Sequence, residues 1–341
     1  MDVRYSRQTR FAPIGEDGQR RLGDARVTLI GCGALGTHLA DHLVRAGVGF
    51  VRICDRDFVD LHNLQRQVLF DEDDVEAAMP KAVAAARKLA RVNHNVTTDP
   101  RVLDVSSDNI ESLIEDVDLV LDGTDELRTR FLINEASVST GRPWVYGGCV
   151  GSRGMVLPVI PGQTPCFACL LPASSGDGDD LETCETAGVI SPAVAVVAAL
   201  QSAEAMKILT GKTDDLLPGL LTLDVWENEY RALKAQRDPA CRICVERRFE
   251  RIGKASADGN LATRLCGGNA VRLTPADPVE LDLEALEAKL AADGTVRRND
   301  YLLRFTTADR ELLVFADGRA VVKGTEDLEE ARRHYEQQVT S

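Results

Sequence analysis

Short hydrophobic runs alternate with helical patterns over roughly the first 145 residues of the chain. Each run has the length of a strand, and each helical segment repeats its apolar positions every three or four residues. This alternation is typical of a parallel sheet with helices on both faces, so we predict a doubly wound α/β fold. The expected strands are residues 27–30, 51–54, 117–121 and 144–146, and the expected helices are residues 35–46, 81–92 and 128–139.

A long apolar stretch at residues 189–209 has the length of a membrane span. Pro192, Gln201, Glu204 and Lys207 interrupt it at helical spacing. The pattern therefore favours a buried helix that begins near Pro192. The first thirty residues contain charges and no apolar run, so we expect no secretory signal, no membrane partner and a cytoplasmic protein.

A segment of linker composition, residues 253–260, separates a second pattern from the first. Short runs of alternating polarity follow it and predict three strands and a terminal helix. The strands are expected at residues 302–305, 312–315 and 320–323, and the helix at residues 327–338. We therefore predict a larger α/β domain at residues 1–250 and a small α/β domain at residues 251–341.

The composition favours a globular protein of about two domains and argues against nucleic-acid binding and disulfides. The chain has 341 residues, of which 44% are hydrophobic, enough for about two domains with a proper core. Its net charge of −14 argues against nucleic acid as a partner, because such binding depends on Lys and Arg replacing counterions. Nine cysteines without a secretory signal favour thiol chemistry or metal binding over disulfides.

A glycine-rich turn follows the first predicted strand. Gly31 permits the turn, Gly33 lets the backbone approach a phosphate, and Gly36 lets the helix pack on the strand. Asp55 ends the next predicted strand, where it can bind a ribose hydroxyl. On its own this pattern also fits a nicotinamide or flavin enzyme, or a tight turn that binds nothing.

Polar residues beyond Asp55 are unusual for a dehydrogenase. Asn63 and Arg66 come soon after it, and Lys81 begins the next predicted helix. Two cations near a ribose site suggest a triphosphate, although a lone charge on a helix is more often simply solvated. Asp125, after a later strand, offers a hard oxygen ligand for Mg²⁺.

Two Cys-x-x-Cys pairs lie downstream of the glycine-rich turn. Four thiolates satisfy the tetrahedral preference of zinc and leave no open position, which indicates a structural site. The pairs are separated by 71 intervening residues, so the fold must bring them together. The four cysteines are Cys166, Cys169, Cys241 and Cys244.

In combination these motifs resemble the ThiF/MoeB/HesA family of ubiquitin-activating-type adenylyltransferases. The resemblance runs from Arg4 to about Cys244 and follows the order and approximate spacing of the family. The motifs are Arg4-Tyr-Ser-Arg7-Gln8, the glycine-rich turn, Asn63-Leu-Gln-Arg66-Gln67, Lys81, Thr124-Asp125, both cysteine pairs, Gly188-Val-Ile-x-Pro192 and Gln201-x-x-Glu204-Ala-x-Lys207.

The resemblance implies a Rossmann-like domain that uses ATP and Mg²⁺ to adenylate the C-terminal glycine of a ubiquitin-like sulfur carrier, with release of pyrophosphate. It implies a homodimer in which Arg7 reaches the ATP of the neighbouring subunit. It also implies that zinc is bound by the four cysteines, and that a sulfurtransferase or cysteine desulfurase is a possible further partner. By resemblance, Asp55 binds the ribose, Asn63, Arg66 and Lys81 bind the phosphates, and Asp125 binds the magnesium.

The sequence departs from the family pattern at two positions. Ala34 replaces a glycine of the usual Gly-Gly-Leu-Gly, and Glu126 replaces a frequent asparagine. The extra carboxylate at Glu126 can either tighten metal binding or repel phosphate. Cys184 lies where some relatives carry a thiol that handles sulfur, and we expect a functional role for it, although Glu182 and Glu185 raise its expected pKa.

Alternatives remain at this level. An NAD(P)-dependent oxidoreductase would bind nicotinamide without Mg²⁺, and a non-catalytic scaffold would bind a carrier without activating it. The sequence does not reveal whether the pathway leads to molybdopterin, thiamine or thiolated tRNA. The C-terminal domain is too short for a rhodanese, despite Cys266 and Arg272 around a pair of glycines, and we expect it to recognise the carrier or a sulfur acceptor.

Overall fold

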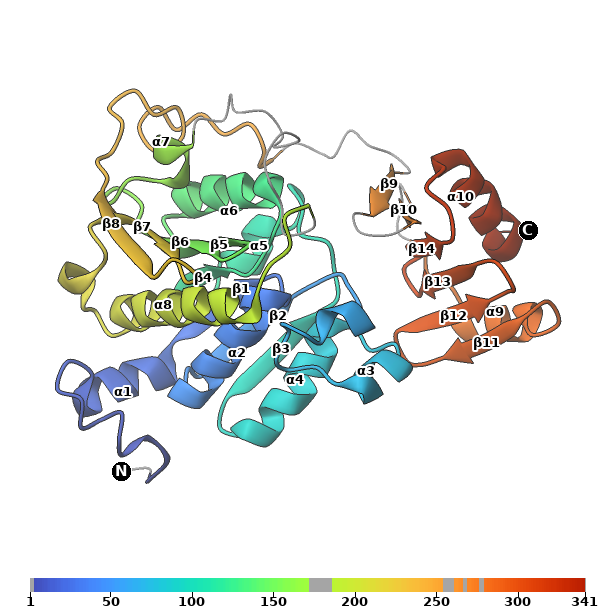
Figure 1. Ribbon diagram of the computed structural model, residues 1–341, viewed down its shortest axis with the longest axis horizontal. Helices are drawn as coiled ribbons and strands as arrows, with labels where there is room; N and C mark the ends of the chain where they lie inside the picture. Colours follow the sequence, from blue (N-terminus) through green and yellow to red (C-terminus); the bar gives the residue numbers. More distant parts are fainter. Residues whose placement is uncertain (1–2, 172–185, 254–260, 266–268, 276–278, 341) are drawn as a thin grey trace. The chain divides into compact units, whose positions relative to one another are not determined.

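The computed structural model describes residues 3–171, 186–253, 261–265, 269–275 and 279–340 (Figure 1). The chain forms two compact units, Met1–Ala255 and Ser256–Ser341. Each unit has its own sheet and its own hydrophobic core.

The first unit is built on an eight-stranded sheet of order β3-β2-β1-β4-β5-β6-β7-β8. The strands from β3 to β5 are parallel, and β6, β7 and β8 extend the sheet in antiparallel fashion. The strands are β1 (Arg26–Ile30), β2 (Phe50–Cys54), β3 (Thr97–Arg101), β4 (Leu119–Asp122), β5 (Trp144–Val150), β6 (Arg153–Val159), β7 (Gly219–Asp224) and β8 (Glu229–Lys234).

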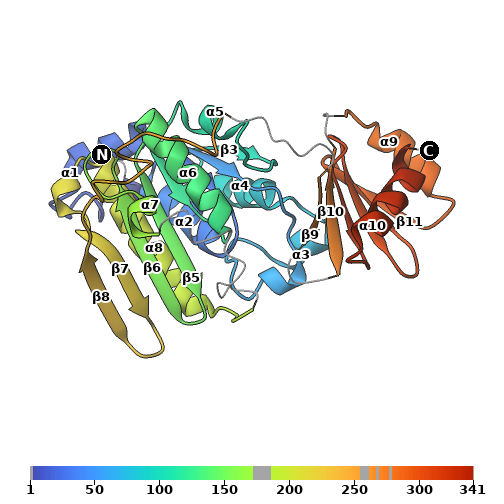
Figure 2. The same cartoon turned by 90° about the horizontal axis from the view of Figure 1, so that it is seen from above.

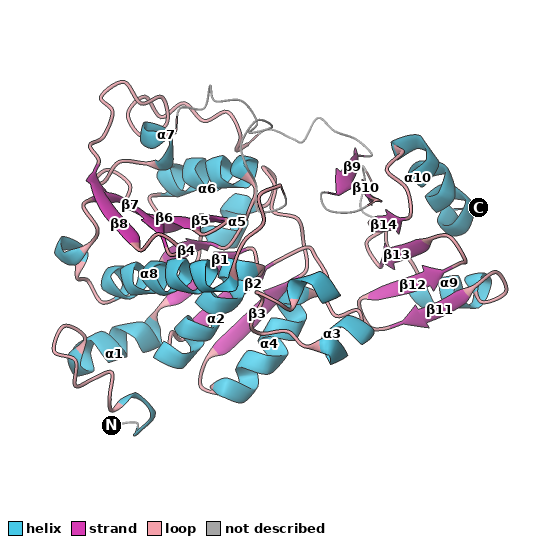
Figure 3. Cartoon of the chain, viewed as in Figure 1, coloured by secondary structure: helices cyan, strands magenta, loops and turns pink. Residues whose placement is uncertain are grey.

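Helices cover both faces of this sheet, as Figures 2 and 3 show. Helices α2, α4 and α8 lie on one face, and α5 and α6 lie on the other with a buried apolar cluster beneath them. The predicted doubly wound α/β fold is confirmed. The helices are α1 (Gly15–Asp24), α2 (Ala34–Ala46), α3 (Glu72–Glu76), α4 (Lys81–Val92), α5 (Ile110–Ile114), α6 (Leu127–Thr140), α7 (Phe167–Leu170) and α8 (Ser191–Leu209).

Helix α8 corresponds to the long apolar stretch. Among the helices in the described part of the chain, it alone is long and apolar enough to cross a membrane. It packs along α2 and across β5 and β6, and it buries the polar side chains of Gln201 and Glu204 together with its apolar ones. These are the surroundings of a core helix, as the sequence predicted.

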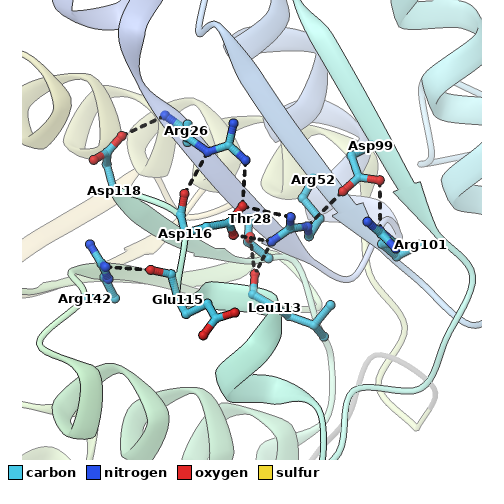
Figure 4. Close-up of polar contacts among 10 residues, drawn as sticks. All are labelled: Arg26, Thr28, Arg52, Asp99, Arg101, Leu113, Glu115, Asp116, Asp118 and Arg142. Atoms are coloured by element: carbon cyan, nitrogen blue, oxygen red, sulfur yellow. Dashed lines mark hydrogen bonds and ion pairs between the residues drawn. The ribbon is translucent and has the colours of Figure 1, made fainter.

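A charged network joins the first three strands to the turn after α5 (Figure 4). Arg52, buried in β2, contacts Asp99 at 3.0 Å and Asp116 at 2.7 Å. It also donates a hydrogen bond of 2.9 Å to the carbonyl oxygen of Leu113. Arg26 reaches the same Asp116 from β1 at 2.7 Å. The network therefore links strands that are distant in sequence through one shared carboxylate.

We expect this network to make stability depend on pH. The hydrogen bond from Arg52 is the largest effect that lowers the pKa of Asp116, from 3.8 to about 2. Because the folded-state pKa is depressed, the contribution to stability is present above about pH 4 and is lost as the pH falls towards 2. Asp116→Asn should lower the free energy of unfolding at pH 7 by about 1 kcal/mol, since the half-exposed carboxylate is screened by water.

Urea unfolding of both proteins at pH 7 and pH 3 checks this prediction. The difference between the two proteins should shrink at pH 3. Asp41→Asn, which removes an i,i+4 partner of Arg45 on α2, serves as the control and should lower the free energy of unfolding by only about 0.5 kcal/mol. An equal difference at both pH values would contradict the prediction.

The second unit contains a six-stranded antiparallel sheet of order β11-β12-β13-β14-β10-β9. Leu303, Phe305, Leu312 and Val314 form the centre of its core, which includes buried residues of the two helices. The predicted terminal helix is α-helical only to Tyr335 and continues as a π-helical turn. The elements are β9 (Leu261–Leu265), β10 (Ala270–Thr274), α9 (Leu283–Leu290), β11 (Thr295–Arg298), β12 (Leu302–Thr306), β13 (Glu311–Phe315), β14 (Ala320–Lys323) and α10 (Leu328–Tyr335).

Candidate functional site

Two glycines of the turn after β1 are required by close backbone packing. Gly31 has a φ of +86°, and a Cβ atom there would lie 2.7 Å from the carbonyl oxygen of Gly123. A Cβ at Gly36 would collide with the carbonyl oxygen of Gly31. These two positions therefore bring the turn, α2 and the loop after β4 together.

Gly33 is different, because its surroundings are open. It is the N-cap of α2, and the nearest atom to a Cβ built there is Nε2 of Gln67 at 3.9 Å. No side chain caps this end of α2. The buried Oε1 of Gln67 has no hydrogen-bond partner in the described part of the chain. An uncapped helix N-terminus beside open space fits an anion such as a nucleotide phosphate. The unpaired amide oxygen of Gln67 can accept a hydrogen bond only from a donor group of a ligand, such as a hydroxyl.

Asp55, directly after β2, links the glycine-rich turn after β1 to the end of β2 through hydrogen bonds. Its Oδ2 accepts a hydrogen bond of 2.6 Å from the backbone N–H of Cys32, and its Oδ1 accepts one of 2.7 Å from that of Asp57. Burial raises the pKa of Asp55, while the positive charge of Lys81 acts in the opposite direction. The carboxylate thus stands at the edge of the sheet beside the open space at Gly33.

Lys81 is the first residue of α4 and is buried. Its Nζ lies 3.2 Å from Oδ2 of Asp57, a partner that the sequence did not suggest. Burial lowers the pKa of Lys81, but the charges of Asp57 and Asp55 raise it more strongly, so the amine is protonated at neutral pH.

Asn63 and Arg66 lie in the connection between β2 and α4. The side chain of Asn63 is buried, and its Oδ1 accepts a 3.0 Å hydrogen bond from the backbone N–H of Asp60. Arg66 is half-exposed and donates a 2.9 Å hydrogen bond to the carbonyl oxygen of His62. Asn63 is therefore engaged in forming its own turn, whereas the guanidinium of Arg66 is held near the surface.

The loop after β4 carries Asp125. Asp122, fully buried, accepts hydrogen bonds from the backbone N–H and the hydroxyl of Thr124, at 2.9 and 2.7 Å. Arg130 of α6 lies 3.2 Å from Asp122 and donates a 2.7 Å hydrogen bond to the carbonyl oxygen of Thr124. Asp125 is exposed, and its charge raises the pKa of both Lys81 and Arg130. The structure thus brings Asp125 to the same edge as Asp55 and Lys81.

Sequence reasoning missed two arginines at this edge. Arg130 supports the loop of Asp125 from within, and Arg56 forms ion pairs with Asp104 and Glu126. The only signal for Arg56 was its position between Asp55 and Asp57, because its other partners are distant in the sequence.

Arg7 is exposed in the N-terminal segment. The neighbouring Gln8 donates a 3.0 Å hydrogen bond to the carbonyl oxygen of Ala46, at the C-terminal end of α2. Since a 13-residue helix is about 20 Å long, this anchor lies far from Gly33 at the other end of α2. The structure therefore does not bring Arg7 to the nucleotide edge of its own chain.

The two cysteine pairs meet in the first unit. Their four Sγ atoms lie within 4.8 Å of one another, and three of the separations are 3.8, 3.6 and 3.5 Å. A tetrahedron of zinc–sulfur bonds of about 2.3 Å has edges of about 3.8 Å, so the arrangement fits zinc. The hydrogen bond between the thiols of Cys166 and Cys169 lowers the pKa of Cys169 and raises that of Cys166, so that without metal the two sulfurs share one proton.

Neighbouring groups hold both halves of the cysteine cluster. Asn134 of α6 accepts a 2.9 Å hydrogen bond from the backbone N–H of Phe167, at the start of α7. Arg237 donates a 3.0 Å hydrogen bond to the carbonyl oxygen of Cys244. Cys184 and Cys266 lie outside the described residues.

The family model described as "ThiF family" matches residues 5–243, which include the turn, the edge of the sheet and three of the four clustered cysteines, and end one residue before Cys244. The chain belongs to the ThiF family. The resemblance inferred from the motifs is thus confirmed.

Relatives with assigned names extend this result. The chain is 44% identical over 338 residues to the sulfur carrier protein ThiS adenylyltransferase of Bacillus subtilis, and the match covers 98% of each chain. It is 36% identical over 253 residues to the sulfur carrier protein adenylyltransferase of Thermus thermophilus, covering 73% of this chain and 92% of that one. The Bacillus match is long enough to include the second unit of this ThiF-family chain.

A solved structure supports the fold. The crystal structure of Escherichia coli MccB with ATP aligns with a TM-score of 0.61 and 24% sequence identity, covering 72% of this chain and 75% of that one. At this identity the likeness establishes that the ThiF-family chain shares the fold.

Proposed function

We propose that this protein uses ATP to adenylate the C-terminal glycine of a ubiquitin-like sulfur-carrier protein, with release of pyrophosphate. The observation that carries the proposal is the 44% identity to a ThiS adenylyltransferase over 98% of both chains. The open space at Gly33, with Asp55, Lys81 and Asp125 at the same edge, supports it.

The chemistry follows from the charges at this edge. When a carboxylate attacks the α-phosphate, negative charge builds up on the phosphate oxygens and on the departing pyrophosphate. Fixed cations stabilise this charge, and no protein nucleophile is needed. Lys81, protonated and buried, and Arg66 are proposed to supply these cations.

The remaining roles are proposed in the same way. Asp55 would accept a hydrogen bond from the ribose, and Asn63 would contact the phosphates. Asp125, exposed at the end of its loop, would hold Mg²⁺, which when bound neutralises phosphate charge. The four clustered cysteines would hold a structural zinc ion, since four sulfurs leave it no open position.

Pyrophosphate exchange into ATP tests the function. Wild-type protein is mixed with Mg²⁺, ATP, labelled pyrophosphate and one carrier at a time, each with and without its terminal glycine. A carrier of the ThiS type comes first, because the Bacillus relative is named as an adenylyltransferase of ThiS. Molybdopterin and tRNA-thiolation carriers follow it. Exchange that requires the terminal glycine supports the proposal, and folded protein that shows no exchange with any carrier refutes it.

We further propose a homodimer in which Arg7 completes the site of the partner subunit. The position of the Arg7 segment at the far end of α2 supports this, because Arg7 is remote from its own Gly33. A cytoplasmic location and a sulfurtransferase or desulfurase partner are consistent with this activity. The functional role expected for Cys184 stays a prediction, as does recognition of the carrier or of a sulfur acceptor by the second unit.

Co-expression of two inactive variants tests the shared site. Arg7→Ala and Asp125→Ala should each be inactive alone, because each lacks one half of every site. In a mixed dimer one of the two sites keeps both residues, so random pairing should restore about a quarter of wild-type exchange. A tagged form of each variant allows the mixed dimer to be purified. An inactive mixed dimer would show that Arg7 does not act across the interface.

A further inference from the structure

Arg56 links three segments at the nucleotide edge. It directly follows Asp55, and its Nη1 lies 2.7 Å from Asp104, in the segment after β3. Its Nη2 forms an ion pair with Glu126, the N-cap residue of α6. Its Nε lies 3.8 Å from Asp57. A guanidinium can serve several carboxylates at once because its donors point in different directions.

Glu126 stands next to the proposed metal ligand Asp125, so its charge matters for a triphosphate. The edge is already rich in carboxylates, because Asp55 and Asp57 share the single charge of Lys81. A bare carboxylate at Glu126 would repel the phosphates of an approaching ligand. The ion pair with Arg56 offsets part of this repulsion and holds the side chain of Glu126 on the side of Asp104.

The loop that carries Asp125 is held at both ends by arginine. Arg130 binds the carbonyl oxygen of Thr124 on one side of Asp125 at 2.7 Å. Arg56 binds the side chain of Glu126 on the other side. A further 3.1 Å hydrogen bond from the hydroxyl of Thr129 to Oε2 of Glu126 fixes the orientation of this carboxylate.

We infer that Arg56 is a positioning residue of the nucleotide site, which offsets the charge of Glu126, holds its side chain in place and thereby favours binding of a triphosphate beside Asp125. The inference rests on the proposed function for the identity of the ligand. It predicts that most of the ATP affinity lost on removal of Arg56 is due to the charge of Glu126, and that removing both charges together restores most of that affinity.

A double-mutant cycle tests this dependence. Arg56→Met, Glu126→Gln and the double variant are titrated with fluorescent MANT-ATP, with Mg²⁺ and separately with EDTA. Arg56→Met should weaken binding about tenfold, equivalent to about 1.4 kcal/mol. Glu126→Gln should bind at least as well as wild type. The double variant should return to within about threefold of wild type, because the two effects cancel.

Two controls distinguish an effect of Arg56 on ATP affinity from an effect on the stability of the protein. Arg45→Met removes an exposed ion pair with Asp41 near the C-terminal end of α2 and should leave MANT-ATP binding unchanged. The thermal midpoint of each variant without ligand is measured in parallel. If Arg56 is only structural, Arg56→Met lowers the midpoint but not the affinity, and the inference is overturned.

Two other outcomes also overturn the inference. Binding by the double variant that is as weak as that of Arg56→Met would mean that Arg56 acts directly on the ligand and not through Glu126. Wild-type protein that does not bind MANT-ATP would remove the nucleotide site altogether. Wild-type protein that binds MANT-ATP with the expected cycle, yet shows no pyrophosphate exchange with any carrier, would refute the proposed function and leave the role of Arg56 supported.

Discussion

Lys81→Ala is expected to reduce pyrophosphate exchange by about a hundredfold or more, because it removes a buried cation from the proposed phosphate site, where charge would develop in the reaction. The substitution also leaves Asp55 and Asp57 without their shared positive partner. The remaining carboxylates would then oppose ATP binding, so both kcat and the KM for ATP should worsen. Steady-state exchange over a range of ATP concentrations separates the two parameters.

Lys88→Ala in the same helix is the matched control. Lys88 forms ion pairs with Asp71 and Asp74, outside the nucleotide edge. Its replacement should cost a little stability but leave exchange within about twofold of wild type, since surface ion pairs are worth about 1 kcal/mol or less. Exchange by Lys81→Ala at the level of this control would exclude a phosphate-binding role for Lys81.

Cys241→Ser is expected to release zinc and to lower the thermal midpoint by about 10 °C or more. Binding of a structural metal contributes directly to folding free energy, and about 3–5 kcal/mol lost from a unit of this size corresponds to such a shift. The cluster joins α7 to the segment after β8, so its loss releases both from each other. Metal analysis of the purified protein and calorimetry measure the two effects.

Cys149→Ser is the control for the cysteine prediction. Cys149 lies at the end of β5 and is not a member of the cluster. This variant should retain about one zinc ion per chain, as expected for a single four-cysteine site. Wild-type protein that contains no metal and does not respond to a chelator would contradict the assignment of the cluster to zinc.

The fold of the first unit was predictable where strands are buried on both faces. The residues of β1 and β4 form nearly continuous apolar runs, which identified them in the sequence. Strand β3 was missed because it is an edge strand with the polar sequence Thr-Thr-Asp-Pro-Arg. Strands β6, β7 and β8 lie beyond the predicted alternation and were also missed. In β8, the other edge strand, all residues are exposed. Edge strands carry little of the signal that burial creates.

The candidate site was predictable as a set of residue types but not as a set of contacts. Spacing placed Asp55 and Lys81 near the ends of elements, yet it gave no indication that Asp57 would be the partner of Lys81. Likewise, the pairing of Arg56 with Glu126 joins residues 70 positions apart. Contacts of this kind depend on how strands are ordered in the sheet, which the sequence pattern left open.

Because the surroundings of Gly33 are open, a side chain added there can obstruct the ligand without disturbing the fold. The backbone φ of Gly33 is −83°, outside the left-handed region, so an alanine can adopt it. Its methyl group would meet no atom closer than 3.9 Å. Gly33→Ala therefore offers a route to a protein with an obstructed nucleotide pocket and otherwise unaltered surfaces. Such a variant would separate recognition of the carrier from its adenylation, because the surface that meets the carrier would be intact while the reaction could not proceed.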